Sequence, residues 1–153
     1  FDYDSYEPID NNPNKLPFFN LLNVDNTRMK HLQLMARFLL IEQGSGYADV
    51  NDTNVSKFIY DNKNDRGIND YSYENEAPAR EVLKTLRIFF EIFKDDPSYD
   101  ENNGVKELST EYFVISTYIL IRHLSKYYVI DDALKEIIRD FIYYFHNRWK
   151  TCD

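Results

Sequence analysis

Apolar residues recur every three or four positions after the first two dozen residues, which is the spacing of a helix with one wide buried face. This spacing predicts a helix from about residue 27 to residue 43. Asp25, Asn26 or Thr27 would cap its start, and Gly44 and Gly46 would end it. The buried stripe of this helix comprises two interleaved rows of side chains: Leu32, Met35 and Leu39, and Leu34, Phe38 and Ile41.

Two short helices are expected on either side of this long one. Pro17 suits the first turn of a short N-terminal helix, where its missing N–H has no cost. Another short helix follows Asp52 or Thr53, and its buried face would carry Val55, Phe58 and Ile59.

The middle of the chain alternates between polar loops and a third long helix. Residues 61–76 are polar and predict a long loop, which in a compact domain often carries function or hides a turn of helix. The third helix is expected from Pro78 to about Lys94. Residues 95–104 predict an acidic loop.

Two further helices are expected in the last third. Ser109 or Thr110 would cap a helix that ends near Tyr127. Its β-branched run also fits a strand, but its length and its lack of Gly and Pro favour a helix. Because it is apolar nearly all round, it is expected to be the central helix. The last helix begins at Asp131 or Asp132, ends near Trp149, and would bury Leu134, Ile137, Ile138, Phe141, Ile142 and Phe145.

These elements predict an all-α fold, an irregular bundle of about five main helices plus a short N-terminal helix. Residues 15–150 would form a single helical domain of ordinary size. Residues 1–14 read as a flexible acidic lead-in, and residues 151–153 as a tail. The scarcity of Gly, four in 153 residues, also disfavours β-sandwiches, barrels and phosphate-binding loops.

Charge and cysteine content narrow the function classes. The chain has 18 basic and 26 acidic residues, a net charge of −8, which disfavours broad binding to nucleic acid or to an anionic membrane. Its one cysteine, Cys152, forms neither an intrachain disulfide nor a cysteine metal site. No secretory signal and no membrane span is apparent. We therefore expect a cytoplasmic protein with no membrane partner, and a segment of a longer chain.

The sequence shows no catalytic or metal-binding motif. His31, His123 and His146 lack metal-site spacing, and the two loops that resemble calcium loops place Arg66, Tyr73, Tyr99 and Thr110 at ligand positions. Gly-rich phosphate loops and nucleophile motifs are missing. The pairs Asp95–Asp96 and Asp131–Asp132 fall at helix boundaries, where capping explains them. We expect no catalytic residue, metal or cofactor, although carboxylates that meet only in space would escape this reasoning.

Basic residues cluster in two places despite the acidic balance. Residues 27–38 contain no acid, and the last helix carries basic residues among Tyr143, Tyr144 and Trp149. Basic and aromatic residues mixed in this way suit contacts with phosphates and bases. Alternatively, the basic residues interact favourably with the C-terminal dipole of the helix, and the aromatic residues belong to the core. The candidates for nucleic-acid or partner contact are Arg28, Lys30, His31, Arg37, Arg148 and Lys150.

The order of motifs over residues 15–150 resembles the helical region that follows the nuclease core in GmrSD-like, ParB/Srx-type restriction proteins. The resemblance is carried by Arg28-Met29-Lys30, by Leu34-x-x-Arg37-Phe38-Leu39 and by Lys57-Phe58-Ile59. Proteins of this family are bacterial defence proteins, similar to nucleotide-dependent DNA endonucleases. Their Asp-Gly-Gln-Gln-Arg and His-Asn-His signatures do not occur in this sequence, so no catalytic residue carries over.

The resemblance implies a non-catalytic helical module that packs on a nuclease core and helps to position DNA. DNA contact is then expected only through the full-length protein, and the rest of a parent protein is the main partner. Within such a module Arg37 would be either a DNA contact or a structural ion pair with Glu42 or a loop acid. The alternative is a stand-alone acidic protein–protein interaction domain, which the net charge and the aromatic content favour. A small all-α enzyme that uses carboxylates is the third hypothesis.

Overall fold

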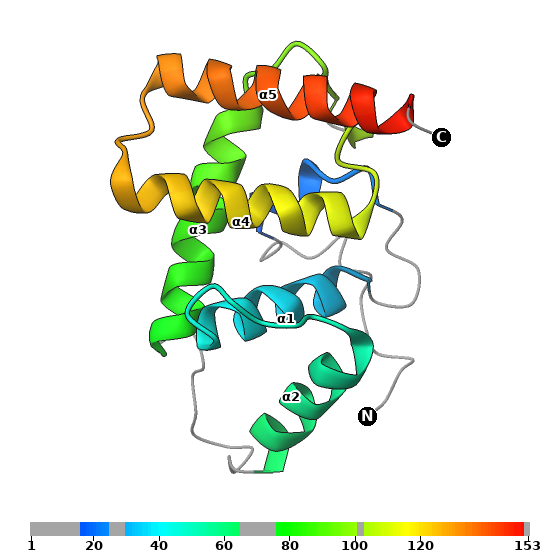
Figure 1. Ribbon diagram of the computed structural model, residues 1–153, viewed down its shortest axis with the longest axis vertical. Coiled ribbons are helices and arrows are strands. Elements are labelled where there is room, and N and C mark those ends of the chain that lie inside the picture. The colour runs from blue at the N-terminus through cyan, green and yellow to red at the C-terminus, as the bar shows by residue number, and fades with distance from the viewer. Residues whose placement is uncertain (1–15, 25–29, 65–75, 101–102, 152–153) are drawn as a thin grey trace.

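The computed structural model describes residues 16–24, 30–64, 76–100 and 103–151, and the predicted all-α fold is confirmed there. These residues contain one 3-10 helix, five α-helices and one short hairpin (Figure 1). Their bounds are η3 Pro17–Asn20, α1 Lys30–Gln43, α2 Asp52–Asn64, α3 Ala77–Phe93, β1 Tyr99–Asp100, β2 Gly104–Val105, α4 Glu111–Tyr127 and α5 Asp132–Lys150. The predicted lead-in 1–14 and most of the predicted loop 61–76 lie outside the described residues.

Helix α3 occupies the centre of the bundle. It packs against η3, α1, α4 and α5, and Figure 1 shows it running along the molecule while α1, α4 and α5 cross it at successive levels. The expectation that residues 110–127 form the central helix is therefore wrong. Although α4 is apolar nearly all round, Tyr112 and Ile119 reach the surface, because its neighbours cover only part of its circumference.

The core is built around aromatic rings from η3, α1, α3 and α4. Phe18 lies edge-on to Phe38 and Phe89, with ring centroids 5.9 and 5.0 Å apart, and Phe38 stacks on Tyr118 at 4.2 Å. All four side chains are almost completely buried. Such ring pairs add to the stabilisation from burial, so the short η3 segment is an integral part of the core.

The hairpin β1–β2 ties the segment after η3 to the start of α4. Val105 N donates to Leu21 O at 2.7 Å, and Asn23 N donates to Leu108 O at 3.1 Å. Gly104 has φ +66°, and a Cβ there would lie 2.5 Å from Leu21 O, so only glycine fits this turn. The acidic-loop prediction for residues 95–104 missed the hairpin, because two-residue strands leave no alternating pattern.

The predicted core face of α5 needs correction. Ile138 and Ile142 are buried, as expected, whereas Leu134 is only half-buried. Ile137, Phe141 and Phe145 are instead 63%, 51% and 52% exposed. Helix α5 lies at the edge of the bundle and packs against α3 through one face, so the apolar stripe of α5 is wider than the surface available to cover it.

Two smaller corrections concern α1 and α2. Leu32 and Ile59, both expected on buried faces, are 45% and 49% exposed. In each helix the remaining predicted face does pack: Leu34, Phe38 and Ile41 of α1 are buried, and so are Val55 and Phe58 of α2.

Candidate functional site

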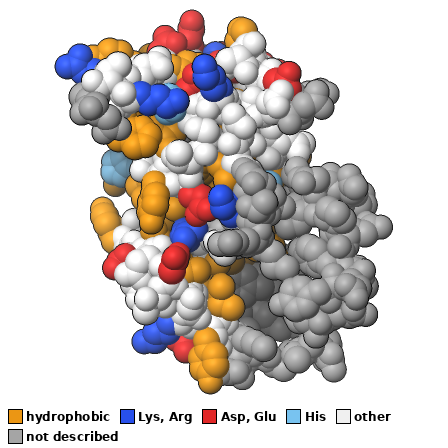
Figure 2. All heavy atoms as spheres, turned by 90° about the vertical axis from the view of Figure 1, so that its right-hand side faces the viewer, with side chains coloured by type: hydrophobic (Ala, Val, Ile, Leu, Met, Phe, Trp, Pro, Cys, Tyr) orange, Lys and Arg blue, Asp and Glu red, His pale blue; other side chains and the backbone are white. Residues whose placement is uncertain are grey.

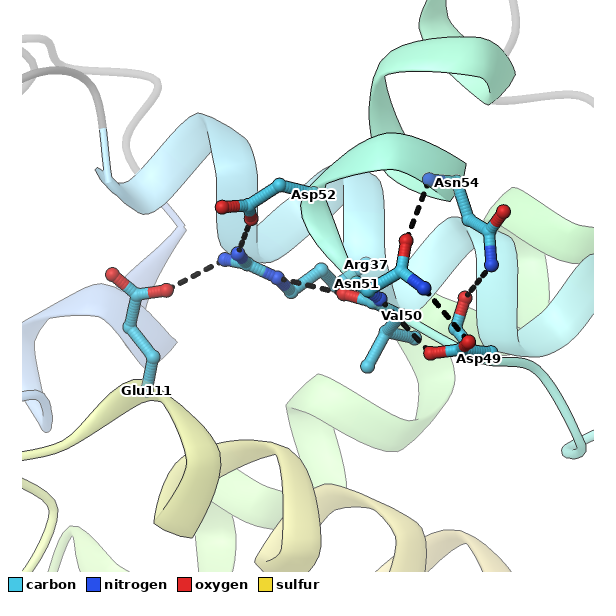
Figure 3. A network of polar contacts seen from close by, with 7 residues as sticks. All are labelled: Arg37, Asp49, Val50, Asn51, Asp52, Asn54 and Glu111. Carbon is cyan, nitrogen blue, oxygen red and sulfur yellow. Dashed lines mark hydrogen bonds and ion pairs between the residues drawn. The ribbon is translucent and has the colours of Figure 1, made fainter.

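Arg37, one of the predicted contact residues, lies at the junction of four chain segments (Figure 3). Its Nη1 donates to Glu111 Oε2 and its Nη2 to Asp52 Oδ1, both at 2.6 Å, and its Nε donates to Val50 O at 3.3 Å. The arginine side chain is 7% exposed. Of the two roles that the sequence left open, the geometry supports the structural ion pair, and the partners are Asp52 and Glu111 rather than Glu42.

Asn51 organises the start of α2 beside this ion pair. Its Oδ1 accepts a hydrogen bond from Asn54 N at 2.9 Å, and its Nδ2 donates to Asp49 Oδ2 at 2.7 Å (Figure 3). The first bond satisfies an N–H that the helix itself leaves unpaired. This cap fixes Asp52 in the position where it meets Arg37.

Glu42 belongs to a second buried cluster, between α1 and α4. Its Oε1 accepts hydrogen bonds from Tyr118 OH and Arg122 Nε, each at 2.7 Å. Burial and the hydrogen bond to Glu42 raise the pKa of Tyr118 far above its ordinary value, and the same carboxylate raises the pKa of Arg122. Both partners therefore keep their ordinary protonation states at neutral pH, and the cluster acts as a structural clamp.

The acidic pairs at helix boundaries also make structural contacts. Asp131 Oδ1 accepts from Leu134 N at 2.9 Å, which confirms its predicted capping role. Asp96 accepts from Ser98 Oγ at 2.5 Å and lies 3.4 Å from Arg139 Nε. Arg139 also donates to Ile92 O at 2.8 Å, so this carboxylate helps to fasten α5 to the end of α3.

The remaining predicted contact residues divide into buried and exposed groups. His31 is 4% exposed and stacks on Phe19, with ring centroids 4.7 Å apart. Arg37 and His31 are thus core residues and do not present their side chains to a ligand. Lys30 is half-buried, and Arg148 and Lys150 are exposed on α5. Arg28 lies outside the described residues.

An aromatic surface between α4 and α5 was missed by the sequence analysis. Phe141, Phe145 and Trp149 of α5 are each about half exposed, and Tyr112 of α4 is 76% exposed. Phe145 stacks between Phe113 and Phe141 at centroid distances of 6.3 and 6.1 Å. We call the shallow cleft that these side chains line the α4–α5 groove; its lining includes Phe113, Ser116, Leu120, Phe141, Phe145 and Trp149.

One basic side chain, that of Arg148, lies beside this aromatic surface. Figure 2, which looks at the end of the molecule where α5 finishes, shows hydrophobic side chains along the left and upper left and both basic and acidic side chains near the top. Arg148 follows Phe145 by three residues and Tyr144 by four, so it lies on the same face of α5. The candidate site is therefore apolar at its centre, with Arg148 at its edge.

His146 lies on the buried side of α5. It is 3% exposed and lies edge-on to Phe113, with ring centroids 5.2 Å apart. Burial and the nearby positive charge of Lys150 lower its pKa. Among the described residues, its Nδ1 and the Oε2 of Glu107 are buried without a hydrogen-bond partner. The apolar surroundings thus favour the neutral imidazole.

Within the described residues, no group of three or more His, Cys, Asp or Glu side chains is arranged to hold a metal ion. None of the helices found there combines the length and the apolar character needed to cross a membrane. Comparisons with protein-family models, curated proteins and solved structures give no match.

Proposed function

We propose that this chain is a non-catalytic helical module that packs against another protein through the aromatic surface of α4 and α5. The observation that carries the proposal is the continuous set of half-exposed aromatic side chains lining the α4–α5 groove. Contiguous apolar surface of this kind marks interaction sites, and Tyr, Trp, Phe and Arg are the residues that protein interfaces favour.

The resemblance to GmrSD-like restriction proteins suggests which partner this aromatic surface packs against. On this proposal the module packs on the nuclease core of a nucleotide-dependent DNA endonuclease in the cytoplasm and helps to orient that core on DNA. The burial of His31 and Arg37 leaves Lys30, Arg148 and Lys150 as the described candidates for contact with DNA or with the core. The net charge of −8 favours protein packing over an independent DNA footprint.

The first test is the sequence of the encoding gene on both sides of this segment. An upstream Asp-Gly-Gln-Gln-Arg core is the expected result, and an open reading frame confined to these residues would overturn the restriction-protein part of the proposal. With that result the chain would be an acidic stand-alone interaction domain, a function that the aromatic groove supports equally well.

The second test uses matched surface variants in the full-length protein. Tyr144 on α5 and Tyr60 on α2 are both 65% exposed. Tyr144→Ser combined with Phe145→Ser is expected to reduce nucleotide-dependent plasmid cleavage by about tenfold or more, because it removes apolar contact area at the interface. Tyr60→Ser is expected to leave cleavage unchanged. Equal activity of all three proteins would contradict docking through α4 and α5.

A further inference from the structure

Asn103 and Gly104, which lie in the hairpin β1–β2, form the only Asn-Gly sequence in the chain. Asn103 is exposed, and Gly104 is the first residue of β2. The side-chain carbonyl carbon of an asparagine can be attacked by the backbone nitrogen of the next residue, which closes a five-membered succinimide ring. Glycine in the second position favours this attack, because it has no side chain to hinder it and the most backbone freedom. The pair therefore combines a reactive sequence with an accessible side chain.

The fold requires the glycine that makes Asn103 reactive. Gly104 has φ +66°, and a Cβ there would lie 2.5 Å from Leu21 O and 2.8 Å from Leu22 C. Any larger residue would be strained by this left-handed backbone and would also clash with the segment after η3. A less reactive neighbour thus cannot replace Gly104 without displacing the hairpin.

Asp100 holds the side chain of Asn103 close to its own backbone. The backbone N of Asn103 donates to Asp100 Oδ1 at 2.9 Å, and its side-chain Nδ2 donates to the same oxygen at 3.2 Å. Because one oxygen accepts both bonds, the side-chain amide is folded back along the turn. The reacting atoms belong to adjacent residues, so the burial of Gly104 does not separate them, and the leaving group departs from the exposed side.

We propose that Asn103 is a site of spontaneous deamidation whose isoaspartate product loosens the hairpin. Gly104 N loses its proton and forms a bond to Asn103 Cγ, while the bond from Cγ to Nδ2 breaks and Nδ2 leaves as ammonia. Water then opens the succinimide: addition at Cγ gives aspartate, and addition at the backbone carbonyl carbon gives isoaspartate. Water is the only co-reactant, and nothing is oxidised or reduced. This inference goes beyond the proposed docking function and does not rest on it.

The two products affect the fold differently. Aspartate keeps the main chain as it was and adds one negative charge at an exposed position. Isoaspartate routes the main chain through Cβ and Cγ, which inserts one methylene group just before Gly104. This insertion displaces Val105, which is fully buried and donates to Leu21 O at 2.7 Å. Because Leu21 is itself fully buried directly after η3, the isoaspartate form weakens the attachment of the hairpin to the core.

The first experiment incubates the folded chain at mildly alkaline pH and follows its peptides by mass spectrometry. The expected result is a gain of one dalton in the peptide that contains Asn103, at a rate at least about tenfold above that at Asn20, an exposed asparagine followed by leucine. Asn103→Gln should abolish the gain, because glutamine would have to close a six-membered ring. If the folded chain stays intact at Asn103 while the urea-unfolded chain reacts, the hairpin protects this residue and the proposal is wrong.

The second experiment measures the stability of the products. Anion exchange separates the deamidated chains by their extra negative charge, and a protease that cleaves before aspartate leaves the isoaspartate form uncut at this position. The isoaspartate form should melt at least about 2 °C below the wild type, whereas the variant Asn103→Asp, which reproduces the other product, should melt as the wild type does. Equal melting of all three forms would contradict the loosening of the hairpin. Neither experiment depends on whether the α4–α5 groove binds a partner.

Discussion

Arg37 shows how one side chain fixes the relative positions of several elements. Its guanidinium joins α1 to the start of α2, to the start of α4 and to the backbone of the intervening loop. A cation this deeply buried is tolerated only with its partners in place. The same basic residue type that suggested a DNA contact in the sequence therefore serves to organise the fold.

Replacing Arg37 by methionine should lower the free energy of unfolding by about 3 kcal/mol, because Glu111 is left without its cation in a partly buried position. Urea denaturation followed by circular dichroism measures the change. Lys94→Met, which removes a more exposed ion pair with Glu91, is the control and should cost much less. Similar losses in the two variants would contradict the structural role of Arg37.

His146 gives the fold a dependence on pH. Burial and the charge of Lys150 hold its pKa in the folded chain below the ordinary value of 6.5. As the pH falls below 6.5, the unfolded chain takes up this proton more readily than the folded chain, so the free energy of unfolding falls. The contribution of His146 is fully present above the ordinary pKa and is lost toward lower pH.

The test compares the stability of the wild type and His146→Gln at about pH 7.5 and about pH 5.5. The loss of stability on acidification should be smaller in His146→Gln than in the wild type. His123→Gln, which alters an exposed histidine of α4, should keep the wild-type loss. An undiminished loss in His146→Gln would show that other groups cause the pH dependence.

At the scale of elements, α5 marks the limit of what periodicity predicts. The sequence correctly predicted that this segment is a helix, that Asp131 caps it, and that Ile138 and Ile142 are buried. Periodicity reports which residues share a face, but it does not report whether a neighbouring element covers that face. The width of the stripe, from Ile137 round to Ile142, was the available signal that part of it stays exposed.

The two phenylalanines that stack with Phe145 should respond differently to truncation. Phe113 of α4 is 7% exposed, and Phe113→Ala should cost about 3–5 kcal/mol. Phe141 of α5 is 51% exposed, so Phe141→Ala should cost far less, at most about 1.5 kcal/mol. Chemical denaturation of both variants measures this contrast, and equal large losses would place Phe141 in the core after all.

At the scale of the whole molecule, the fold class and the order of helices followed from sequence, whereas the centre of the bundle and the candidate site did not. Both depend on which elements meet. Glu42 with Arg122, and Arg37 with Glu111, are pairs separated by many residues, and no spacing rule brings them together. The α4–α5 groove likewise depends on how two consecutive helices lie side by side, which their separate sequences do not specify.

The balance between this apolar surface and the net charge predicts how the molecule behaves on acidification. At pH 7 a net charge of −8 keeps copies apart, and that repulsion vanishes near the isoelectric point of about 4.9. Exposed aromatic surface should then drive self-association. Light scattering during a titration toward pH 5 should rise in the wild type and in Tyr60→Ser. It should rise much less in the double variant Phe141→Ser/Phe145→Ser, since the groove then lacks the apolar area that copies would share. Identical scattering from all three proteins would mean that loss of charge alone, and not the α4–α5 surface, governs association.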